Sequence, residues 1–237
     1  MAYVGPIDQY DFMGATQFRL LCTLGLRSNH NLLDFGCGCL RAGRFLINYL
    51  EKGRYHGVEP NEWLVDMAFK TQLGQDLKEI KSPKFDYSDD FSVNFDATFD
   101  YIVAQSIFSH ADACMIDKAL KSFKASLKDS GLIAVTFVEG ATDFEDKGWV
   151  YPDVVTYSKS RINKFSLDAG LYIKRIPWYH PRQTWYLLAK KREMIPSNRL
   201  LHYLSGSVLF QEEFSLSVRS HNRIYRLVRK LLGKDSL

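Results

Sequence analysis

The sequence has no apolar run of about 18 residues, which predicts that no helix crosses a membrane. Its first residues show no basic segment followed by an apolar core, so we expect no secretory signal. Cysteine is scarce, with four in 237 residues, and Cys37-x-Cys39 has no second pair at zinc-ligand spacing. We therefore expect no metal site, and reduced, buried cysteines of the kind found in cytoplasmic proteins.

An excess of one charge sign is also missing from most of the chain. The whole sequence has 31 basic and 27 acidic residues, and residues 221–237 account for the net charge of +4 with five basic residues and one acid. The first 220 residues are therefore balanced, which argues against a long nucleic-acid-binding surface. An apolar fraction of 46% over 237 residues is enough for one globular domain with an appendage.

Residues 32–46 combine a short apolar run, a pair of glycines and helical spacing. The apolar run, residues 32–35, suits a buried parallel strand. Gly36 and Gly38 permit a sharp turn and a close approach of the backbone to a ligand. The apolar residues from Gly43 onward follow helical spacing, so the turn leads into a helix N-terminus and predicts a polar ligand there.

Two neighbours of the glycine pair indicate the kind of ligand. A dinucleotide-binding turn has a third glycine where this chain has Arg41, and Asp34 suits a cationic ligand better than a pyrophosphate. An unrelated α/β enzyme with a glycine turn is the alternative. The pattern Asp34-x-Gly36-x-Gly38 resembles the first motif of class I S-adenosylmethionine-dependent methyltransferases, with Leu40 in place of a third glycine. The resemblance implies cofactor contacts from Asp34, Gly36, Cys37 and Gly38.

The resemblance covers about residues 10–190 and implies a fold. That fold is α/β and Rossmann-like, a mostly parallel seven-stranded sheet with helices on both faces and a C-terminal antiparallel hairpin. The last two expected strands, residues 171–176 and 184–190, are joined by a short connection that permits an antiparallel pair and not a crossover. We expect a methyltransferase domain over residues 1–190, with its N-terminal helix as a lid, and an extension over residues 191–237.

Two polar side chains are candidates for opposite ends of the cofactor. Glu59 follows a short strand, residues 55–58, and lies 21 positions after Gly38. That spacing suits a carboxylate that accepts both hydroxyl protons of a ribose, and the resemblance implies the same role. Gln17, in the N-terminal helix, is expected to reach the amino-acid end of the cofactor; the alternative is a helix that only packs.

A third strand is expected over residues 83–90. The resemblance implies an acid at its end on the adenine amino group, and an apolar neighbour on the adenine ring. These roles are assigned to Asp90 and Phe91, although Asp89 fits the acid as well, and a solvated acidic loop is the alternative.

The apolar strand over residues 101–104 opens into polar residues at the end where α/β sheets bind ligands. The resemblance implies that this segment lies near the transferred methyl group, with Gln105 and Ser106 as cofactor contacts. His110 is a candidate general base because an imidazole titrates near neutral pH; the alternative is that it holds the loop. His180, on a loop across the expected pocket, is the second candidate.

The loops over residues 139–157 and 177–183 are rich in aromatic residues, and we expect them to form the acceptor pocket. A hydrophobic mini-core beneath the loops is the alternative. Rings beside Asp153, His180 and Arg182 suit a sugar or another polar ring. The aromatic residues are Trp149, Tyr151, Tyr157, Trp178 and Tyr179.

These features predict an S-adenosylmethionine-dependent enzyme that methylates an oxygen of a small polar molecule or a glycan and releases S-adenosylhomocysteine. An RNA or protein methyltransferase, and a non-catalytic cofactor-binding partner protein, are the alternatives. The basic amphipathic stretch over residues 221–237 fits an anionic membrane surface or a partner, or else a tail that is disordered or packed on the domain. We expect a cytoplasmic protein that contacts the membrane through this stretch, while the sequence gives no oligomeric state.

Overall fold

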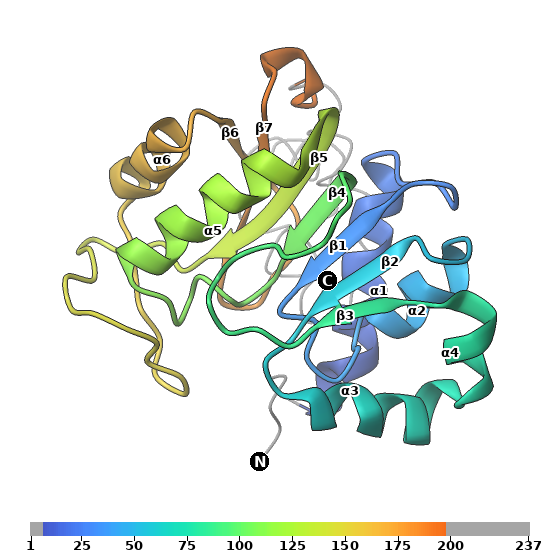
Figure 1. The fold of residues 1–237 in the computed structure, drawn as a ribbon. Coiled ribbons are helices and arrows are strands. Elements are labelled where there is room, and N and C mark those ends of the chain that lie inside the picture. Colours follow the sequence, from blue (N-terminus) through green and yellow to red (C-terminus); the bar gives the residue numbers. More distant parts are fainter. Residues whose placement is uncertain (1–6, 198–237) are drawn as a thin grey trace, which may run out of the picture. The chain divides into compact units, whose positions relative to one another are not determined.

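A seven-stranded sheet in the order β3-β2-β1-β4-β5-β7-β6 is the centre of the computed structural model, which describes residues 7–197 (Figure 1). Every neighbouring pair is parallel except those of β7, which runs antiparallel to both β5 and β6. This arrangement confirms the expected sheet and its C-terminal antiparallel hairpin. The strands are β1 (Leu32–Phe35), β2 (Tyr55–Val58), β3 (Lys84–Asp86), β4 (Phe99–Ala104), β5 (Leu127–Phe137), β6 (Tyr172–Ile176) and β7 (Thr184–Ala189).

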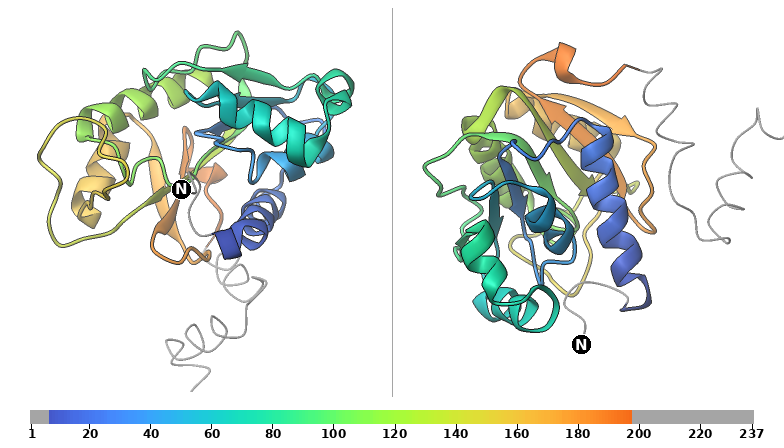
Figure 2. Two further views of the ribbon diagram at one scale, coloured as in Figure 1. Left: turned by 90° about the horizontal axis from the view of Figure 1, so that it is seen from below. Right: turned by 90° about the vertical axis from the view of Figure 1, so that its right-hand side faces the viewer.

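Helices cover both faces of this sheet. In Figure 1, α5 (Ala113–Ser126) and α6 (Lys159–Asp168) lie in front of it, and α1 (Tyr10–Thr23) and α2 (Gly43–Tyr49) lie behind. The right-hand view of Figure 2 shows α1 and α5 on opposite sides of the sheet. Among residues 7–197, no helix is long and apolar enough to cross a membrane. The other helical segments are η1 (Ile7–Gln9), α3 (Glu62–Ala68), the π-helix η2 (Phe69–Leu73), α4 (Asp76–Lys81) and η3 (Arg192–Met194).

All described residues belong to one compact unit. The domain boundary expected at residue 190 stays a prediction. The basic stretch over residues 221–237 lies outside the residues that the structure describes.

Helix α5 begins where Asp112 caps its first turn by accepting a hydrogen bond from a backbone N–H at 2.8 Å. Its buried residues follow helical spacing and belong to the main hydrophobic core. The helix ends at Ser126, because Leu127 is extended and pairs with Phe99 in the sheet. The buried residues of α5 are Ile116, Ala119, Leu120 and Phe123.

The strand expected over residues 83–90 is shorter than predicted. It ends at Asp86, whose carboxylate accepts hydrogen bonds from the backbone N–H and the hydroxyl of Ser88 at 3.0 and 2.8 Å. A side chain that bonds the backbone two residues ahead turns the chain. The acidic residues that follow therefore leave the sheet.

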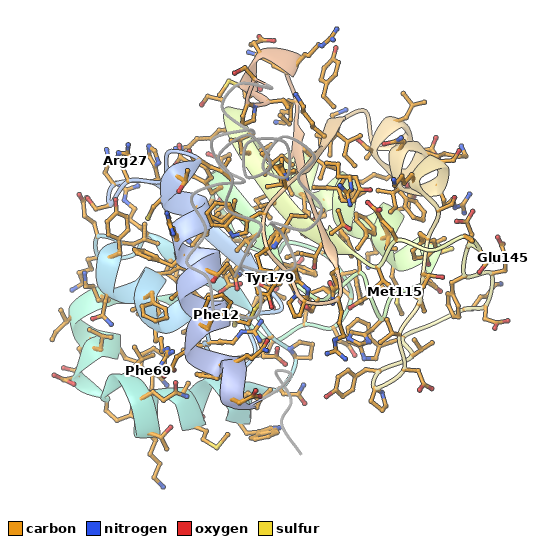
Figure 3. All side chains as sticks on the ribbon, turned by 180° about the vertical axis from the view of Figure 1, so that it is seen from behind. Phe12, Arg27, Phe69, Met115, Glu145 and Tyr179 are labelled. Atoms are coloured by element: carbon orange, nitrogen blue, oxygen red, sulfur yellow. The ribbon has the colours of Figure 1, made fainter. Side chains whose placement is uncertain are left out.

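Helix α1 is attached to the loop between β6 and β7. The indole N–H of Trp178 donates to the carbonyl of Thr16 at 3.2 Å, and the ring of Tyr179 packs edge-on against Phe12, with their centroids 5.5 Å apart (Figure 3). Two segments from opposite ends of the domain are thus joined beside the cavity described below.

Candidate active site

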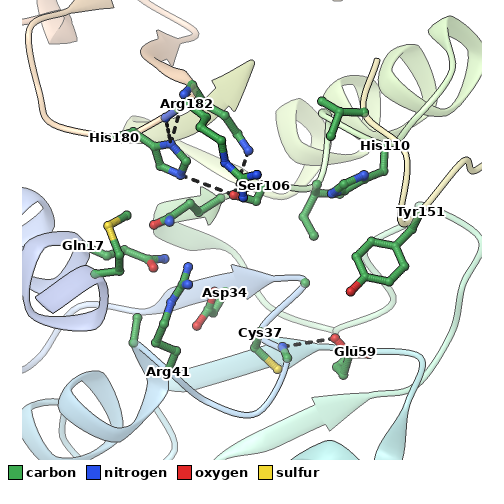
Figure 4. A pocket seen from close by; sticks show the side chains of 18 of the residues that line it. Gln17, Asp34, Cys37, Arg41, Glu59, Ser106, His110, Tyr151, His180 and Arg182 are labelled. Carbon is green, nitrogen blue, oxygen red and sulfur yellow. Dashed lines mark hydrogen bonds between the residues drawn. The ribbon is translucent and has the colours of Figure 1, made fainter. Parts of the chain in front are cut away.

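A cavity of about 600 Å³ opens at the C-terminal ends of β1, β2 and β4 (Figure 4). It is lined by α1, by the loop after β1, by the segment after β4, and by the loops that carry Trp149 and His180. Open α/β sheets bind ligands at this edge, and small-molecule pockets have volumes of roughly 300–1,000 Å³. The segments expected to share one site therefore do meet.

The loop after β1 requires glycine at two positions. Gly36 and Gly38 have φ angles of +76° and +55°, which side chains rarely adopt. A Cβ atom on Gly36 would lie 2.0 Å from Cδ1 of Ile107, so no larger residue fits there. The backbone N–H groups of Gly36 and Cys37 donate to the carbonyl of Val58 at 2.8 and 3.0 Å. These bonds fasten the loop to the end of β2.

Leu40, at the position of the third glycine of the motif, keeps a left-handed backbone with a φ of +57°. Its side chain is fully buried, and a Cβ atom on Gly43 would lie 2.8 Å from its Cδ2. The left-handed conformation costs a non-glycine residue about 1–2 kcal/mol. Burial of a leucine side chain contributes about 1.5–3 kcal/mol and offsets that cost. The loop thus retains its left-handed turn without a glycine.

Asp34 lies at the floor of the cavity and is only 4% exposed. The hydroxyl of Tyr55 donates to its Oδ2 at 2.8 Å. Burial raises the pKa of Asp34 to about 6, although the Tyr55 hydrogen bond and the charge of Arg41 act in the opposite direction. A buried carboxylate of this kind favours a cationic ligand, because the ligand charge stabilises the ionised form.

Glu59 directly follows β2 and faces the glycine loop. Its Oε2 accepts the backbone N–H of Gly38 at 3.1 Å, and its Oε1 accepts the backbone N–H and the side-chain amide of Asn61 at 3.0 and 2.9 Å. A carboxylate has about four lone-pair sites, so one stays open on Oε2. A second becomes open when the Asn61 amide turns away. Glu59 can then accept two hydroxyl protons.

Three predicted cofactor contacts come from α1 and from the end of β4. Gln17, Gln105 and Ser106 all line the cavity. Gln105 is 7% exposed, and neither atom of its amide has a hydrogen-bond partner. An unpartnered buried amide costs about 1–3 kcal/mol, so this group suits a ligand that both donates and accepts. Ser106 has a φ of +63° and is held by its backbone N–H, which donates to Oγ1 of Thr136 at 2.8 Å.

His110 lines the cavity between Trp149 and Tyr151, whose ring centroids lie 5.4 and 5.1 Å from its own. Its Nδ1 is 2.6 Å from the backbone carbonyl oxygen of Asp153. Because a carbonyl only accepts, Nδ1 carries the proton and Nε2 keeps a lone pair. Burial lowers the pKa of His110, and the charge of Arg182 lowers it further, against the effect of the Asp153 hydrogen bond. At neutral pH the ring is therefore an uncharged proton acceptor.

His180 has the opposite tautomer. Its Nδ1 accepts the backbone N–H groups of Arg182 and Gln183 at 3.3 and 3.0 Å, so Nε2 carries the proton and lies 3.4 Å from Oγ of Ser106. Burial, with the charges of Arg41 and Arg182, lowers the pKa of His180 to about 3. Because Nδ1 already accepts two backbone N–H groups, His180 has no free lone pair in this arrangement, and its role as a second base stays a prediction.

Asp90 and Phe91 lie outside the lining of the cavity. The carboxylate of Asp90 accepts hydrogen bonds from the backbone N–H of Ser92 at 2.9 Å and from Nζ of Lys118 at 3.3 Å. Phe91 packs against Trp149, with their ring centroids 5.9 Å apart. Because β3 ends early, the structure does not bring this predicted pair to the site.

The aromatic residues of the two loops serve two purposes, since some line the cavity and others form a hydrophobic core beneath the loops. Trp149 and Tyr151 line the cavity. Tyr157 and Trp178 are buried, and the hydroxyl of Tyr157 donates to the carbonyl of Ala111 at 3.0 Å. The first pair therefore belongs to a pocket wall, and the second pair to a core beneath the loops.

Gln183 belongs to the loop expected at the pocket, but the sequence does not single it out as a site residue. Its amide donates to Oγ of Ser106 at 3.0 Å and to Oγ of Ser109 at 3.3 Å, which leaves its Oε1 buried without a partner. Its position depends on the β6–β7 loop folding back over β4, and no local pattern marks such a long-range contact. Arg41 also lines the cavity. Its position in the glycine loop is a local sequence feature from which a place in the cavity could have been predicted.

The comparisons with known proteins agree with this arrangement. Residues 33–133 match the family described as "Methyltransferase domain", while no curated protein matches the sequence. The matched segment runs from β1 into β5 and contains both the glycine loop and Glu59. The matched segment is therefore a methyltransferase domain, and the sheet order is that of the class I S-adenosylmethionine-dependent methyltransferase fold. The chain is thus a methyltransferase, and its methyl donor is S-adenosylmethionine.

Solved structures share the fold at low sequence identity. An S-adenosylmethionine-dependent methyltransferase from Clostridium acetobutylicum is 15% identical with a TM-score of 0.55, over 76% of this chain and 92% of that one. Magnesium protoporphyrin IX methyltransferase (ChlM) from Synechocystis PCC 6803 with bound S-adenosylhomocysteine is 14% identical with a TM-score of 0.57, over 81% and 90%. DesVI from Streptomyces venezuelae is 15% identical with a TM-score of 0.58, over 80% and 95%.

The residues of the cavity fit this methyl donor. The glycine loop, with Gly36, Cys37 and Gly38, lines the cavity with its backbone. Asp34 offers a buried carboxylate to a cationic group, and Gln105 offers an unpartnered amide. The carboxylate of Glu59 has room for a hydroxyl proton.

Proposed function

We propose that this enzyme methylates a hydroxyl oxygen of a small polar acceptor, such as a sugar or another hydroxylated ring. The lone pair on Nε2 of His110, fixed by the bond from Nδ1 to Asp153, carries this proposal. A hydroxyl loses its proton as it is methylated, and a neutral imidazole near pH 7 is suited to take it. The volume of the cavity and the wall formed by Trp149 and Tyr151 support a small acceptor.

The titles of two similar structures support an acceptor that is not a nucleic acid, without distinguishing oxygen from nitrogen. One is titled a magnesium protoporphyrin IX methyltransferase and another a glycopeptide N-methyltransferase. Both names denote acceptors other than a nucleic acid. The balanced charge of residues 1–220 points in the same direction.

For the methyl donor, we assign contacts to the residues that line the deeper half of the cavity. Glu59 accepts the ribose hydroxyls, while Asp34 and Gln17 face the amino-acid end. The glycine loop, with Cys37, lies along the donor, and Gln105 and Ser106 bind close to the reacting methyl. His180 donates from Nε2 and holds Ser106 in place.

The reaction requires one bond to form as another breaks. Bound S-adenosylmethionine supplies a methyl group whose bond to sulfur breaks, with its electron pair moving to sulfur, as the acceptor oxygen bonds to carbon. The hydroxyl proton passes to Nε2 of His110. The carbonyl of Asp153 then stabilises the charged ring through Nδ1–H. The other residues hold the two reactants in line, which is a large part of catalysis in a transfer of this kind.

Transfer of a labelled methyl group tests the proposal. The protein is incubated with labelled S-adenosylmethionine and separate pools of hydroxylated sugars and phenols, amines, RNA and protein, and the products are analysed by mass spectrometry. We expect an O-methylated product from the hydroxyl pools. Labelled amines, RNA or protein in its place would contradict the hydroxyl acceptor. Donor binding without transfer to any pool would indicate a non-catalytic partner protein.

A further inference from the structure

The two halves of the cavity differ in charge. The deeper half contains both acidic residues of the lining, Asp34 and Glu59 at the ends of β1 and β2, and these outnumber its one permanent cation, Arg41. The outer half is lined by residues from 107–110, 138, 149–154 and 180–183, and none of these lining residues is acidic. Its one permanently charged side chain is Arg182. A cationic donor suits the deeper half, so the outer half is left for a ligand of the opposite sign.

Arg182 lines the cavity beside His180 and is exposed (Figure 4). Within residues 7–197, its guanidinium makes no ion pair, whereas Arg44 pairs with Asp11 and Arg175 pairs with Glu139 at 2.8 Å. It acts electrostatically on both histidines of the site, since its charge lowers the pKa of His110 and of His180. An unpaired cation therefore lines the same cavity as His110, and no carboxylate of the lining forms an ion pair with it.

The backbone that carries this cation is held in place. The N–H groups of Arg182 and Gln183 both donate to Nδ1 of His180, and the amide of Gln183 donates to Oγ of Ser106. On the opposite side, the rings of Trp149 and Tyr151 pack against His110 and form a wall. The outer half thus offers a ring-stacking face, a proton acceptor and a guanidinium, all on fixed backbone.

We propose that the acceptor is an acidic hydroxylated ring, whose carboxylate or phosphate binds Arg182 while the hydroxyl to be methylated faces His110. This inference rests on the proposed hydroxyl methylation. A guanidinium binds planar carboxylate and phosphate oxygens through two parallel hydrogen bonds, which fixes orientation as well as charge. The bound anion also offsets the charge that Arg182 exerts on His110, so the base gains proton affinity only when the acceptor is present.

Matched probes test this recognition. Glucose, glucuronate and glucose 6-phosphate share a ring and differ in one group, and catechol and 3,4-dihydroxybenzoate form a flat-ring pair. Each is titrated by calorimetry into protein saturated with S-adenosylhomocysteine. We expect an anionic member to bind at least tenfold tighter than its neutral partner. The sugar set separates carboxylate from phosphate as the preferred anion.

Two variants show where the preference arises. Arg182→Gln is expected to remove it and to leave the affinity for S-adenosylhomocysteine within twofold of wild type. Arg192→Gln, at an exposed arginine of η3 outside the cavity lining, is the control and keeps the preference. In wild type, the pKa of His110, measured by NMR, rises when the preferred anion binds; in Arg182→Gln it does not.

Three results would overturn the inference. The first is that in no matched set does an anionic member bind tighter than its neutral partner, whether the members bind equally or none of them binds. The second is a preference that persists in Arg182→Gln. The third is a loss of S-adenosylhomocysteine affinity in Arg182→Gln, which would assign the guanidinium to the carboxylate of the donor. Each leaves methyl transfer to a hydroxyl intact, whereas wild-type protein that fails to bind S-adenosylhomocysteine would refute the proposed function itself.

Discussion

The backbone N–H of Gly38 donates a hydrogen bond to Oε2 of Glu59 across 3.1 Å. The bond joins the loop after β1 to the residue after β2, and these are the two positions where the sequence predicts cofactor contacts. Glu59 consequently shapes the loop as well as facing the cavity. Substitutions at this residue therefore have to separate the two effects.

We expect S-adenosylhomocysteine to bind and NAD not to bind. Asp34 repels a pyrophosphate, and Arg41 stands where the dinucleotide turn has its third glycine. Calorimetric titration of the same protein with each compound measures both affinities. Tight NAD binding with no response to S-adenosylhomocysteine would refute the assignment.

Glu59→Gln is expected to weaken S-adenosylhomocysteine binding by about 1–3 kcal/mol, because the charge-assisted bonds to the ribose are lost. The amide oxygen can still accept the N–H of Gly38, so the fold should survive. Glu59→Ala also removes that bond and is expected to lower the melting temperature. Glu62→Gln, on an exposed residue of α3, is the matched control. An unchanged affinity in Glu59→Gln would exclude the ribose contact.

Turnover is expected to fall by about 10²–10⁴-fold in His110→Gln, with donor affinity nearly unchanged. The wild-type rate should be constant above about pH 6.5 and decrease below the pKa of His110, since burial lowers that pKa from 6.5 and only the neutral ring is a base. His180→Gln should retain the same pH profile, because the pKa of His180 is about 3. Near-normal turnover in folded His110→Gln would remove His110 from the mechanism.

The affinity for S-adenosylmethionine should decrease as the pH falls through about 6. Burial raises the pKa of Asp34 to about 6 in the free protein, and only the carboxylate attracts the cationic donor. The effect on stability has the opposite sign. Because the folded pKa lies above the unfolded value of 3.8, the contribution of Asp34 to the free energy of unfolding is complete below that value and is lost as the pH rises through about 6. In Asp34→Asn, neither the affinity for S-adenosylmethionine nor the melting temperature should change with pH near 6. Calorimetric titrations and thermal melts at several pH values measure the two.

Leu40→Gly should be more stable than Leu40→Ala by about 1 kcal/mol, the reverse of the usual order, because only glycine relieves a φ of +57°. Both variants should be less stable than wild type by about 2–5 kcal/mol, since a buried leucine is lost. Leu46 is buried in ordinary helical backbone of α2, and its Ala variant should be more stable than its Gly variant. Denaturant unfolding measures the free energy of unfolding of the four variants. If Ala is more stable than Gly at both positions, the backbone of Leu40 is not strained.

The sheet and the donor half of the site could be predicted because their signals are local. An apolar run that meets Gly36 and Gly38 specifies a strand and a turn within a few residues. Glu59 follows its own strand, and parallel pairing brings it beside that turn. Each of these contacts needs only the register of two neighbouring strands.

The outer half could not be predicted in the same way. Asp90 leaves the sheet because Asp86 turns the chain early, and a single side-chain bond of this kind has no reliable sequence signature. The tautomers of His110 and His180 depend on backbone groups brought in by distant loops. The unpartnered amide of Gln105 likewise becomes visible only when the packing around it is known.

The hydrogen bond from Trp178 to Thr16 joins residues 162 positions apart in the chain. It ties the helix that carries Gln17 to the loop that carries Arg182. In a chimaera with a related enzyme, exchange of this loop alone would leave the carbonyl of Thr16 facing a foreign side chain. Grafts that alter acceptor preference should therefore transfer the first helix together with the loop.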